Sequence, residues 1–110
     1  MAHSFPTLRS SDLLIRSNDL GDNLARVMGN APVVLMRGHG VTVVGRDVRQ
    51  AVFHAVYTEW NAGIQAQTMS LGTPIYLTTE EAGAAAEAND RQIARAWDYW
   101  SAQADSGSSG

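Results

Sequence analysis

The apolar and polar positions predict two strands in the first half of the chain, with a histidine between them. Val33–Met36 and Val41–Val44 are near-continuous apolar runs rich in β-branched residues. Such runs are typical of strands that are buried on both faces. His39 lies between these runs, with Gly38 before it and Gly40 after it. We therefore expect a sharp break between two core strands, from which the imidazole emerges.

The segment before these strands has the spacing of a short helix. Residues 19–28 place apolar side chains on one helical face, and Ser17 or Asn18 can cap its start. Gly29 can end it in a left-handed conformation. A short strand is expected just upstream, at residues 13–16.

A long helix is predicted directly after the strands. Asp47 is a good N-cap, with Gln50 as its capping-box partner, and the helix should run to about Leu71. The expected buried stripe has the helical period and consists of Val48, Val52, Ala55, Val56, Trp60 and Ile64.

A last helix follows a brief extended linker at residues 75–77. Thr78 and Glu81 form a capping-box pattern, and the helix is expected to continue to about Ala102. Its apolar face consists of Ile93, Trp97 and Trp100.

The two ends of the chain differ from this patterned middle. Residues 1–12 are polar, without a period, and resemble translated sequencing-adaptor sequence, so we expect a non-native or disordered leader. Residues 105–110 are rich in serine and glycine and are expected to form a flexible tail. Residues 13–104 would then carry the folded part.

Length, charge and composition limit the classes of function. The 110 residues suffice for one small domain, and a net charge of −3 without a basic run argues against a nucleic-acid partner. No apolar stretch is long enough to span a bilayer. The chain has no cysteine, which excludes disulfides and thiolate metal sites. The glycines do not form a dinucleotide or phosphate-loop motif.

His39 and Arg37 are the main candidates for chemistry. His39 is either a metal ligand or catalytic group, or a turn histidine bonded to nearby backbone. One histidine cannot complete a catalytic zinc site, which needs three protein ligands, so the other ligands would come from elsewhere. Arg37 suits bidentate binding of an anionic substrate and equally suits an ordinary ion pair at a strand end.

Four further features have mainly structural interpretations. His54 is expected to be a surface or groove histidine. Glu59 falls on or near the predicted buried stripe, where an anchoring ion pair is favoured over an acid–base role. Asn89 is interpreted as a packing or interface contact. The aromatic residues near the C-terminus are expected in the core or in a subunit contact, and they are Trp97, Tyr99 and Trp100.

The pattern from Leu35 to Gly45, with its Arg37-Gly38-His39-Gly40 core and the amphipathic helix after it, resembles the class II aldolase/adducin family. The resemblance runs from about Leu14 to Trp100 and corresponds to the C-terminal half of the family domain. The ending from Ala96 to Trp100 is most similar to the subgroup of 2-hydroxy-3-carboxymuconic semialdehyde decarboxylases.

The resemblance implies a fragment of a three-layer α/β/α domain with a mostly antiparallel central sheet. It also implies a homotetramer that holds a divalent metal, most commonly zinc, with manganese or magnesium as alternatives. The absence of cysteine is compatible with the cytoplasm, where we expect the protein. His39 matches the last of three metal-binding histidines in the family, and the upstream pair and the acid–base carboxylate have no counterpart here. The catalytic residues are therefore unknown, and this chain is expected to be truncated and inactive.

We therefore expect a metal-dependent carbon–carbon lyase of the decarboxylase type, acting through a metal-stabilised enolate on a small carbonyl or carboxylate substrate. Arg37 is the candidate substrate-binding residue and His39 the candidate metal ligand. Two alternatives stay open, namely a sugar-phosphate aldolase or epimerase on the same scaffold, and a non-catalytic adducin-like structural module. An apolar two-stranded sheet is marginal alone, which indicates that it belongs to a larger sheet.

Overall fold

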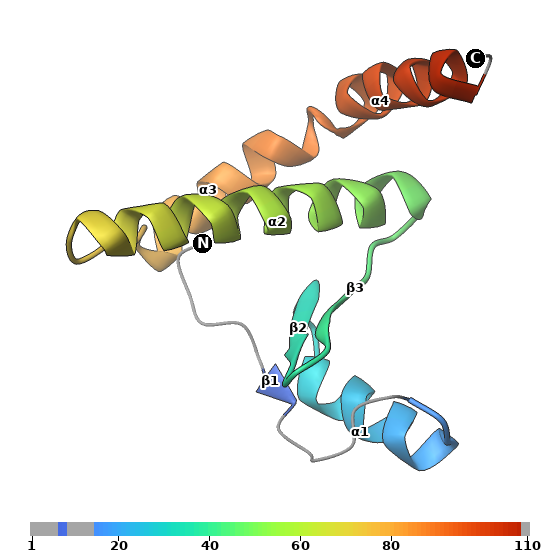
Figure 1. Cartoon of the computed structure of the whole chain (residues 1–110), viewed down its shortest axis with the longest axis vertical. Coiled ribbons are helices and arrows are strands. Elements are labelled where there is room, and N and C mark those ends of the chain that lie inside the picture. The colour runs from blue at the N-terminus through green and yellow to red at the C-terminus, as the bar shows by residue number, and fades with distance from the viewer. Residues whose placement is uncertain (1–6, 9–14, 109–110) are drawn as a thin grey trace.

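The protein has an α/β fold in which a small sheet lies between two helices. The computed structural model describes residues 7–8 and 15–108. Its sheet has the order β1-β2-β3, with β1 parallel to β2, and β2 antiparallel to β3. Figure 1 shows this sheet between α1 and α2, and the expected α/β class is confirmed. The elements are β1 (Thr7–Leu8), α1 (Asn18–Met28), β2 (Val33–Met36), β3 (Gly40–Val43), α2 (Val48–Leu71), α3 (Thr79–Asp90) and α4 (Ile93–Ser108).

Strands β2 and β3 form the predicted hairpin. Val33 pairs with Val43 and Met36 with Gly40, so β3 begins one residue earlier than the apolar pattern indicated. Val33 and Val34 are buried, whereas Leu35 and Val41 are exposed. The prediction of burial on both faces therefore holds only at the start of β2. The reason is that, among the described residues, the other end of the hairpin has no covering layer.

The predicted N-caps of all three capped helices form. Ser17 Oγ accepts a hydrogen bond from Leu20 N at 3.2 Å, and Asp47 Oδ1 accepts one from Gln50 N at 2.9 Å. In a standard capping box, the side chain of Gln50 would accept a hydrogen bond from the backbone N–H of the N-cap residue Asp47. Here Gln50 Oε1 accepts instead from the backbone N–H of the preceding residue, Arg46, at 2.7 Å. These side chains satisfy backbone N–H groups that have no partner inside the helix.

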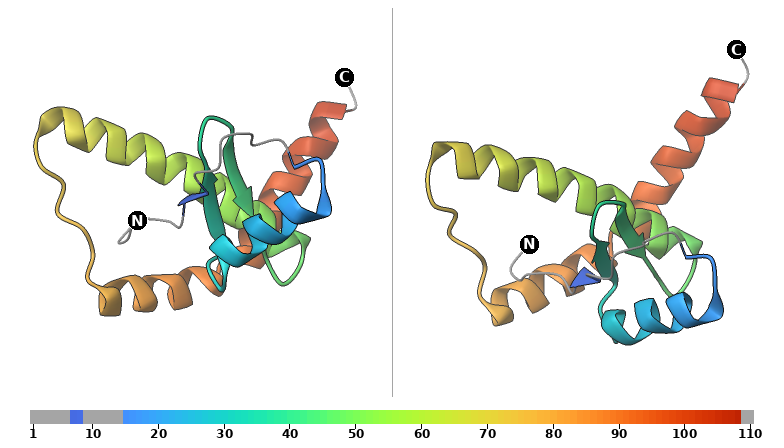
Figure 2. Two further views of the ribbon diagram at one scale, coloured as in Figure 1. Left: turned by 90° about the horizontal axis from the view of Figure 1, so that it is seen from below. Right: turned by 60° about the horizontal axis from the view of Figure 1, so that its bottom comes forward.

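The last predicted helix is two helices, α3 and α4, separated at residues 91–92. Gln92 N donates to Asn89 O at 2.9 Å in a tight turn at the break. Figure 2 shows that α3 runs back toward the first half of α2, and that α4 begins against α2 there before its C-terminal part extends away. The break brings Ile93 into the core, where it is only 5% exposed. The capping box of α3 formed by Thr78 and Glu81 is present as predicted.

Both predicted termini contain more regular structure than expected. Strand β1 pairs with β2 inside the segment 1–12, which was expected to be disordered, and the other residues of that segment lie outside the described part. Of the strand expected at 13–16, residues 15–16 belong to no element, and 13–14 are not described. Helix α4 continues to Ser108, where a flexible tail was predicted from residue 105. Ser106 Oγ donates to Gln103 O at 2.9 Å, in keeping with continued helix.

The buried stripe of α2 also differs from the prediction. Its one buried residue is Phe53, whereas the predicted stripe residues Val48, Trp60 and Ile64 are 67%, 52% and 61% exposed. The first half of α2 packs against β3 and α4, which places Phe53 inside. Toward its C-terminus, α2 meets the linker before α3, where Gln65 Nε2 donates to the Tyr76 hydroxyl at 3.3 Å.

Candidate functional site

The β2–β3 turn presents the two candidate side chains, Arg37 and His39, at the tip of the hairpin. Both are exposed. The backbone N–H of His39 donates to Met36 O at 3.0 Å and closes the turn. Within the described part of the chain, neither the imidazole nor the guanidinium makes a hydrogen bond or an ion pair. The fold therefore holds the backbone of this turn and leaves both side chains available.

Glycine is needed on each side of His39 for this geometry. Gly38 has φ +80° and Gly40 has φ +110°, and both values lie in a region that side-chain-bearing residues rarely adopt. A Cβ at either position would meet no neighbouring atom within 4 Å. The requirement is therefore conformational rather than steric, and the prediction of a sharp glycine break around His39 is confirmed.

The donor set for a metal is incomplete in this part of the molecule. Among residues 7–8 and 15–108, no group of three or more histidine, cysteine or acidic side chains lies close enough to hold a metal ion. His39 fits a metal site as one accessible nitrogen ligand. A divalent metal would need further ligands from outside this set.

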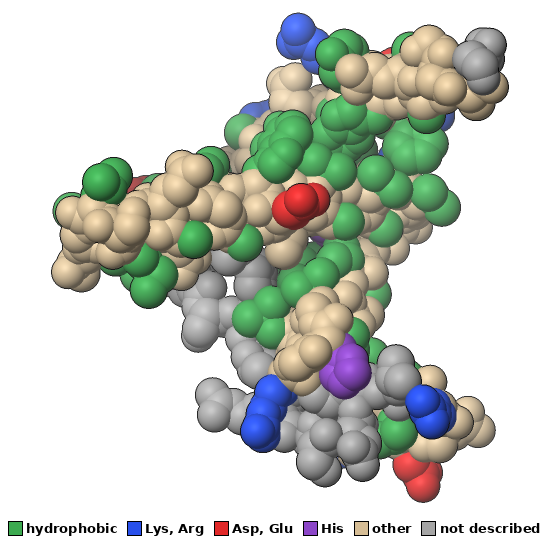
Figure 3. Space-filling view, viewed as in Figure 1, with side chains coloured by type: hydrophobic (Ala, Val, Ile, Leu, Met, Phe, Trp, Pro, Cys, Tyr) green, Lys and Arg blue, Asp and Glu red, His purple; other side chains and the backbone are tan. Residues whose placement is uncertain are grey.

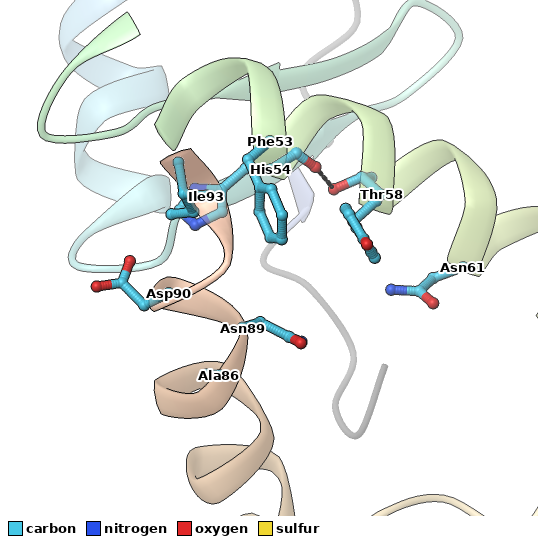
Figure 4. Close-up of a pocket in the computed structure, with 9 residues that line it drawn as sticks. Phe53, His54, Thr58, Asn61, Ala86, Asn89, Asp90 and Ile93 are labelled. Carbon is cyan, nitrogen blue, oxygen red and sulfur yellow. Dashed lines mark hydrogen bonds between the residues drawn. The ribbon is translucent and has the colours of Figure 1, made fainter. Parts of the chain in front are cut away.

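A cleft of about 190 Å³ lies between α2 and α3, away from the hairpin turn. Figure 4 shows His54, Thr58 and Asn61 on α2 facing Asn89 and Asp90 of α3. Apolar side chains complete its lining, namely Phe53, Tyr57, Ala86 and Ile93.

His54 joins this cleft to the end of the hairpin. Its Nδ1 lies 3.0 Å from Val44 O, and a carbonyl oxygen only accepts, so Nδ1 carries the proton. The carbonyl of His54 accepts from Thr58 Oγ1 at 2.6 Å. His54 is half-buried, in agreement with the prediction of a groove histidine, and its role here is to bind α2 to the residue after β3.

An ion pair that the sequence did not reveal holds Asp90, one of the residues that line the cleft. Arg46 Nη1 donates to both carboxylate oxygens of Asp90, at 2.9 and 3.0 Å, and Gln50 Nε2 donates to Oδ1 at 3.0 Å. These hydrogen bonds, that of Arg46 first, hold the pKa of the Asp90 carboxyl below its ordinary value. Because 44 residues separate Arg46 from Asp90, no local pattern signals the contact.

The remaining candidates occupy different places. Glu59 is exposed, which corrects the expectation that it lies on the buried stripe. Glu59 follows the buried Phe53 by six residues, which turns it about 240° round the helix axis from Phe53. It therefore lies on a different side of α2 from the buried face. Asn89 lines the cleft. In the aromatic trio Trp97 and Trp100 are half-buried, whereas Tyr99 is 63% exposed and does not belong to the core.

Comparison with known proteins gives a family match and curated relatives. The family described as "Class II Aldolase and Adducin N-terminal domain" matches residues 4–66. Decarboxylase tropJ of Talaromyces stipitatus is 35% identical over 116 aligned residues, which cover 87% of this chain and 43% of that protein. The 3,4-dihydroxyphthalate decarboxylases of Arthrobacter keyseri and Rhodococcus jostii are each 40% identical over 60 residues, or 54% of this chain.

The chain spans less than half the length of these relatives. The matched part covers 43% of decarboxylase tropJ, 24% of the Arthrobacter keyseri protein and 25% of the Rhodococcus jostii protein. No solved structure matches it significantly. None of the helices in the described ranges is long and apolar enough to cross a membrane.

Proposed function

Because the chain belongs to the class II aldolase and adducin family, we propose that it carries part of the active site of a decarboxylase, a carbon–carbon lyase. The observation that carries the proposal is the β2–β3 turn, where two positive-φ glycines hold an exposed His39 without a side-chain partner among the described residues. The decarboxylase names of its relatives favour this reaction over other lyase reactions.

His39 would act as one nitrogen ligand of a divalent metal, on which this family generally depends. Zinc is the metal that we favour. When bound, such a metal polarises a substrate carbonyl and stabilises the negative charge left as carbon dioxide departs, as in an enolate. The other ligands would come from residues outside the described part, in a homotetramer that we place in the cytoplasm.

Arg37 would bind a carboxylate of the substrate. Its guanidinium lies two residues before His39 on the same turn and has no ion pair within the described ranges. A guanidinium binds a planar carboxylate through two parallel hydrogen bonds. Substrates related to 3,4-dihydroxyphthalate, an aromatic dicarboxylate, would meet this requirement.

A chimera tests the proposal. The part of the Arthrobacter keyseri decarboxylase that corresponds to residues 4–66 is replaced by this chain's residues, and carbon dioxide release from 3,4-dihydroxyphthalate and bound metal are measured. We expect an active chimera, and His39→Ala should lower both bound metal and turnover by about 100-fold or more. His54→Gln is the matched control, because it removes an imidazole that we do not assign to metal.

Retention of metal and turnover in the His39→Ala chimera would contradict the proposal.

Arg37→Lys should raise KM with little change in kcat, because it weakens binding of ground state and transition state alike. The 110-residue chain alone should bind zinc only weakly. Stoichiometric micromolar binding that depends on His39 would show that the ligand set of this chain is already sufficient.

A further inference from the structure

A groove lined by aromatic side chains runs between α2 and the start of α4, and neither the hairpin turn nor the α2–α3 cleft explains it. We call it the aromatic groove, and its volume is about 440 Å³. Figure 3 shows apolar side chains gathered along this part of α2 and beside α4. The groove side chains that matter here are Phe53, Tyr57, Trp60, Arg95, Tyr99 and Trp100.

The rings of the groove support one another in a fixed arrangement. Phe53 and Tyr57 stack with ring centroids 4.3 Å apart, and Trp60 meets Tyr57 edge-on at 5.1 Å. Trp100 lies edge-on to Trp60 at 6.4 Å. Such offset and edge-on contacts are the favourable geometries for aromatic pairs, so the walls are organised before anything binds.

The inner and outer rings differ in exposure. Phe53 is 5% exposed, whereas Trp60 is 52% and Tyr99 is 63% exposed. The groove therefore has a closed apolar base and open aromatic walls. A flat apolar body can stack on those walls and reach the base.

The polar part of the lining has positive charge. Arg95 lines the groove, and in the described residues its guanidinium makes no ion pair or hydrogen bond. Gln92, just before α4, and the hydroxyls of Tyr57 and Tyr99 add uncharged side-chain donors to the lining. No carboxylate of the described ranges lines the groove, so the charge of Arg95 is not compensated within it.

We propose that the aromatic groove binds a planar aromatic carboxylate, with its ring against Trp60 and Trp100 and its carboxylate paired with Arg95. The rings select a flat apolar body, and the guanidinium selects a planar anion that can accept two parallel hydrogen bonds. This site is separate from the β2–β3 turn, and its occupancy does not rest on metal or on His39.

Binding of benzoate to the full 110-residue chain tests the site, with neutral benzamide as the matched probe. Affinity is measured by equilibrium dialysis and by quenching of tryptophan fluorescence. We expect benzoate to bind about tenfold or more tightly than benzamide, and Arg95→Gln to remove that difference. Arg91→Gln is the control, because Arg91 is exposed at the end of α3 and does not line the groove.

A second variant separates the ring contribution from the charge. Trp60→Ser should weaken both benzoate and benzamide, and because Trp60 is half exposed the change should leave the far-ultraviolet circular dichroism unaltered. These results would leave the decarboxylase proposal untouched, since His39→Ala should not change benzoate affinity.

Three results would overturn the inference. Equal binding of benzoate and benzamide would show an apolar surface without anion selectivity, and unchanged benzoate affinity in Arg95→Gln would remove the assigned cation. A dimer on sizing that dissociates with Trp60→Ser and binds no benzoate would show that a second copy covers the groove.

Discussion

The turn between β2 and β3 depends on two glycines whose backbone conformations side chains rarely adopt. Gly40→Ala should lower the free energy of unfolding by about 1–2 kcal/mol, because φ +110° is strained for alanine. The measurement is urea unfolding followed by circular dichroism at one fixed protein concentration.

Gly63→Ala is the matched control for that change. Gly63 lies inside α2, where a Cβ meets nothing within 4 Å, so alanine should raise the free energy of unfolding by about 0.5–1 kcal/mol. Opposite signs for the two variants are expected. A stabilising Gly40→Ala would show that the positive φ is not required.

The Asp90 carboxylate should make stability depend on pH. Its pKa is lowered in the folded chain by hydrogen bonds from Arg46 and then Gln50. A lowered pKa contributes stability that is present above the unfolded value, near 3.8, and is lost as pH falls through the folded value. The natural chain should therefore have a higher thermal midpoint than Asp90→Asn above pH 3.8. This difference should shrink as the pH falls from 3.8 through the lower pKa of the folded chain.

Asp98→Asn serves as the control for Asp90. Asp98 is exposed on α4, and within the described part of the chain it has no ion pair. Its replacement should leave the acid dependence of the thermal midpoint nearly unchanged. An Asp90→Asn chain with the same acid dependence as the natural chain would show that the Arg46 contact contributes nothing.

At the scale of elements, the start of α3 relies on its capping box. Thr78 Oγ1 accepts from Glu81 N at 3.1 Å, and Glu81 Oε2 accepts from Thr78 N at 3.0 Å. Thr78→Ala should cost about 1 kcal/mol, measured by urea unfolding. Thr79→Ala, one residue further on, removes no described side-chain hydrogen bond and should cost much less, whereas equal losses would assign the effect to helix propensity.

Local rules predicted the elements whose ends are set by neighbouring residues. Ser17, Asp47 and Thr78 cap helices where the sequence indicates, because each cap acts over three residues. Contacts over long separations escaped prediction. The helix break at residues 91–92 accompanies burial of Ile93, and no glycine or proline signals it.

The same division applies to the candidate site. The glycine-flanked turn at His39 follows from adjacent residues and was predicted. The pairing of Arg46 with Asp90 was not predicted, because the two residues are 44 positions apart and meet only when α3 packs near the end of the hairpin. The position of Glu59 was wrongly predicted, because the neighbours of α2, and not its apolar period, decide which side of the helix is covered.

At the scale of the whole molecule, the chain is less compact than is typical of a single domain of 110 residues. Its radius of gyration is 16.0 Å, whereas about 13 Å is typical of a compact chain of this size. Among the described residues only Val33, Val34, Phe53 and Ile93 are buried apolar residues. Strand β3 lies at an edge of the sheet, and Val41 on it is 42% exposed.

This edge predicts self-association, because unpaired backbone groups beside exposed apolar side chains are templates for another strand. Val41→Lys should lower the apparent mass on sizing chromatography at high protein concentration. Ile75→Lys, at a linker residue that is 99% exposed, is the control and should not. A natural chain that stays monomeric at every concentration would contradict the prediction.

Helix α2 packs against β3 and α4 near Phe53, and from there its second half extends to Leu71 beside the linker before α3. Eighteen residues at a rise of 1.5 Å make this extension an arm of about 27 Å. A tilt of about 5° near Phe53 would thus move the far end by about 2 Å. Because His54 joins this region to the end of the hairpin and Gln65 joins the second half of α2 to the linker, a small shift at the hairpin end would be carried along α2 to the linker.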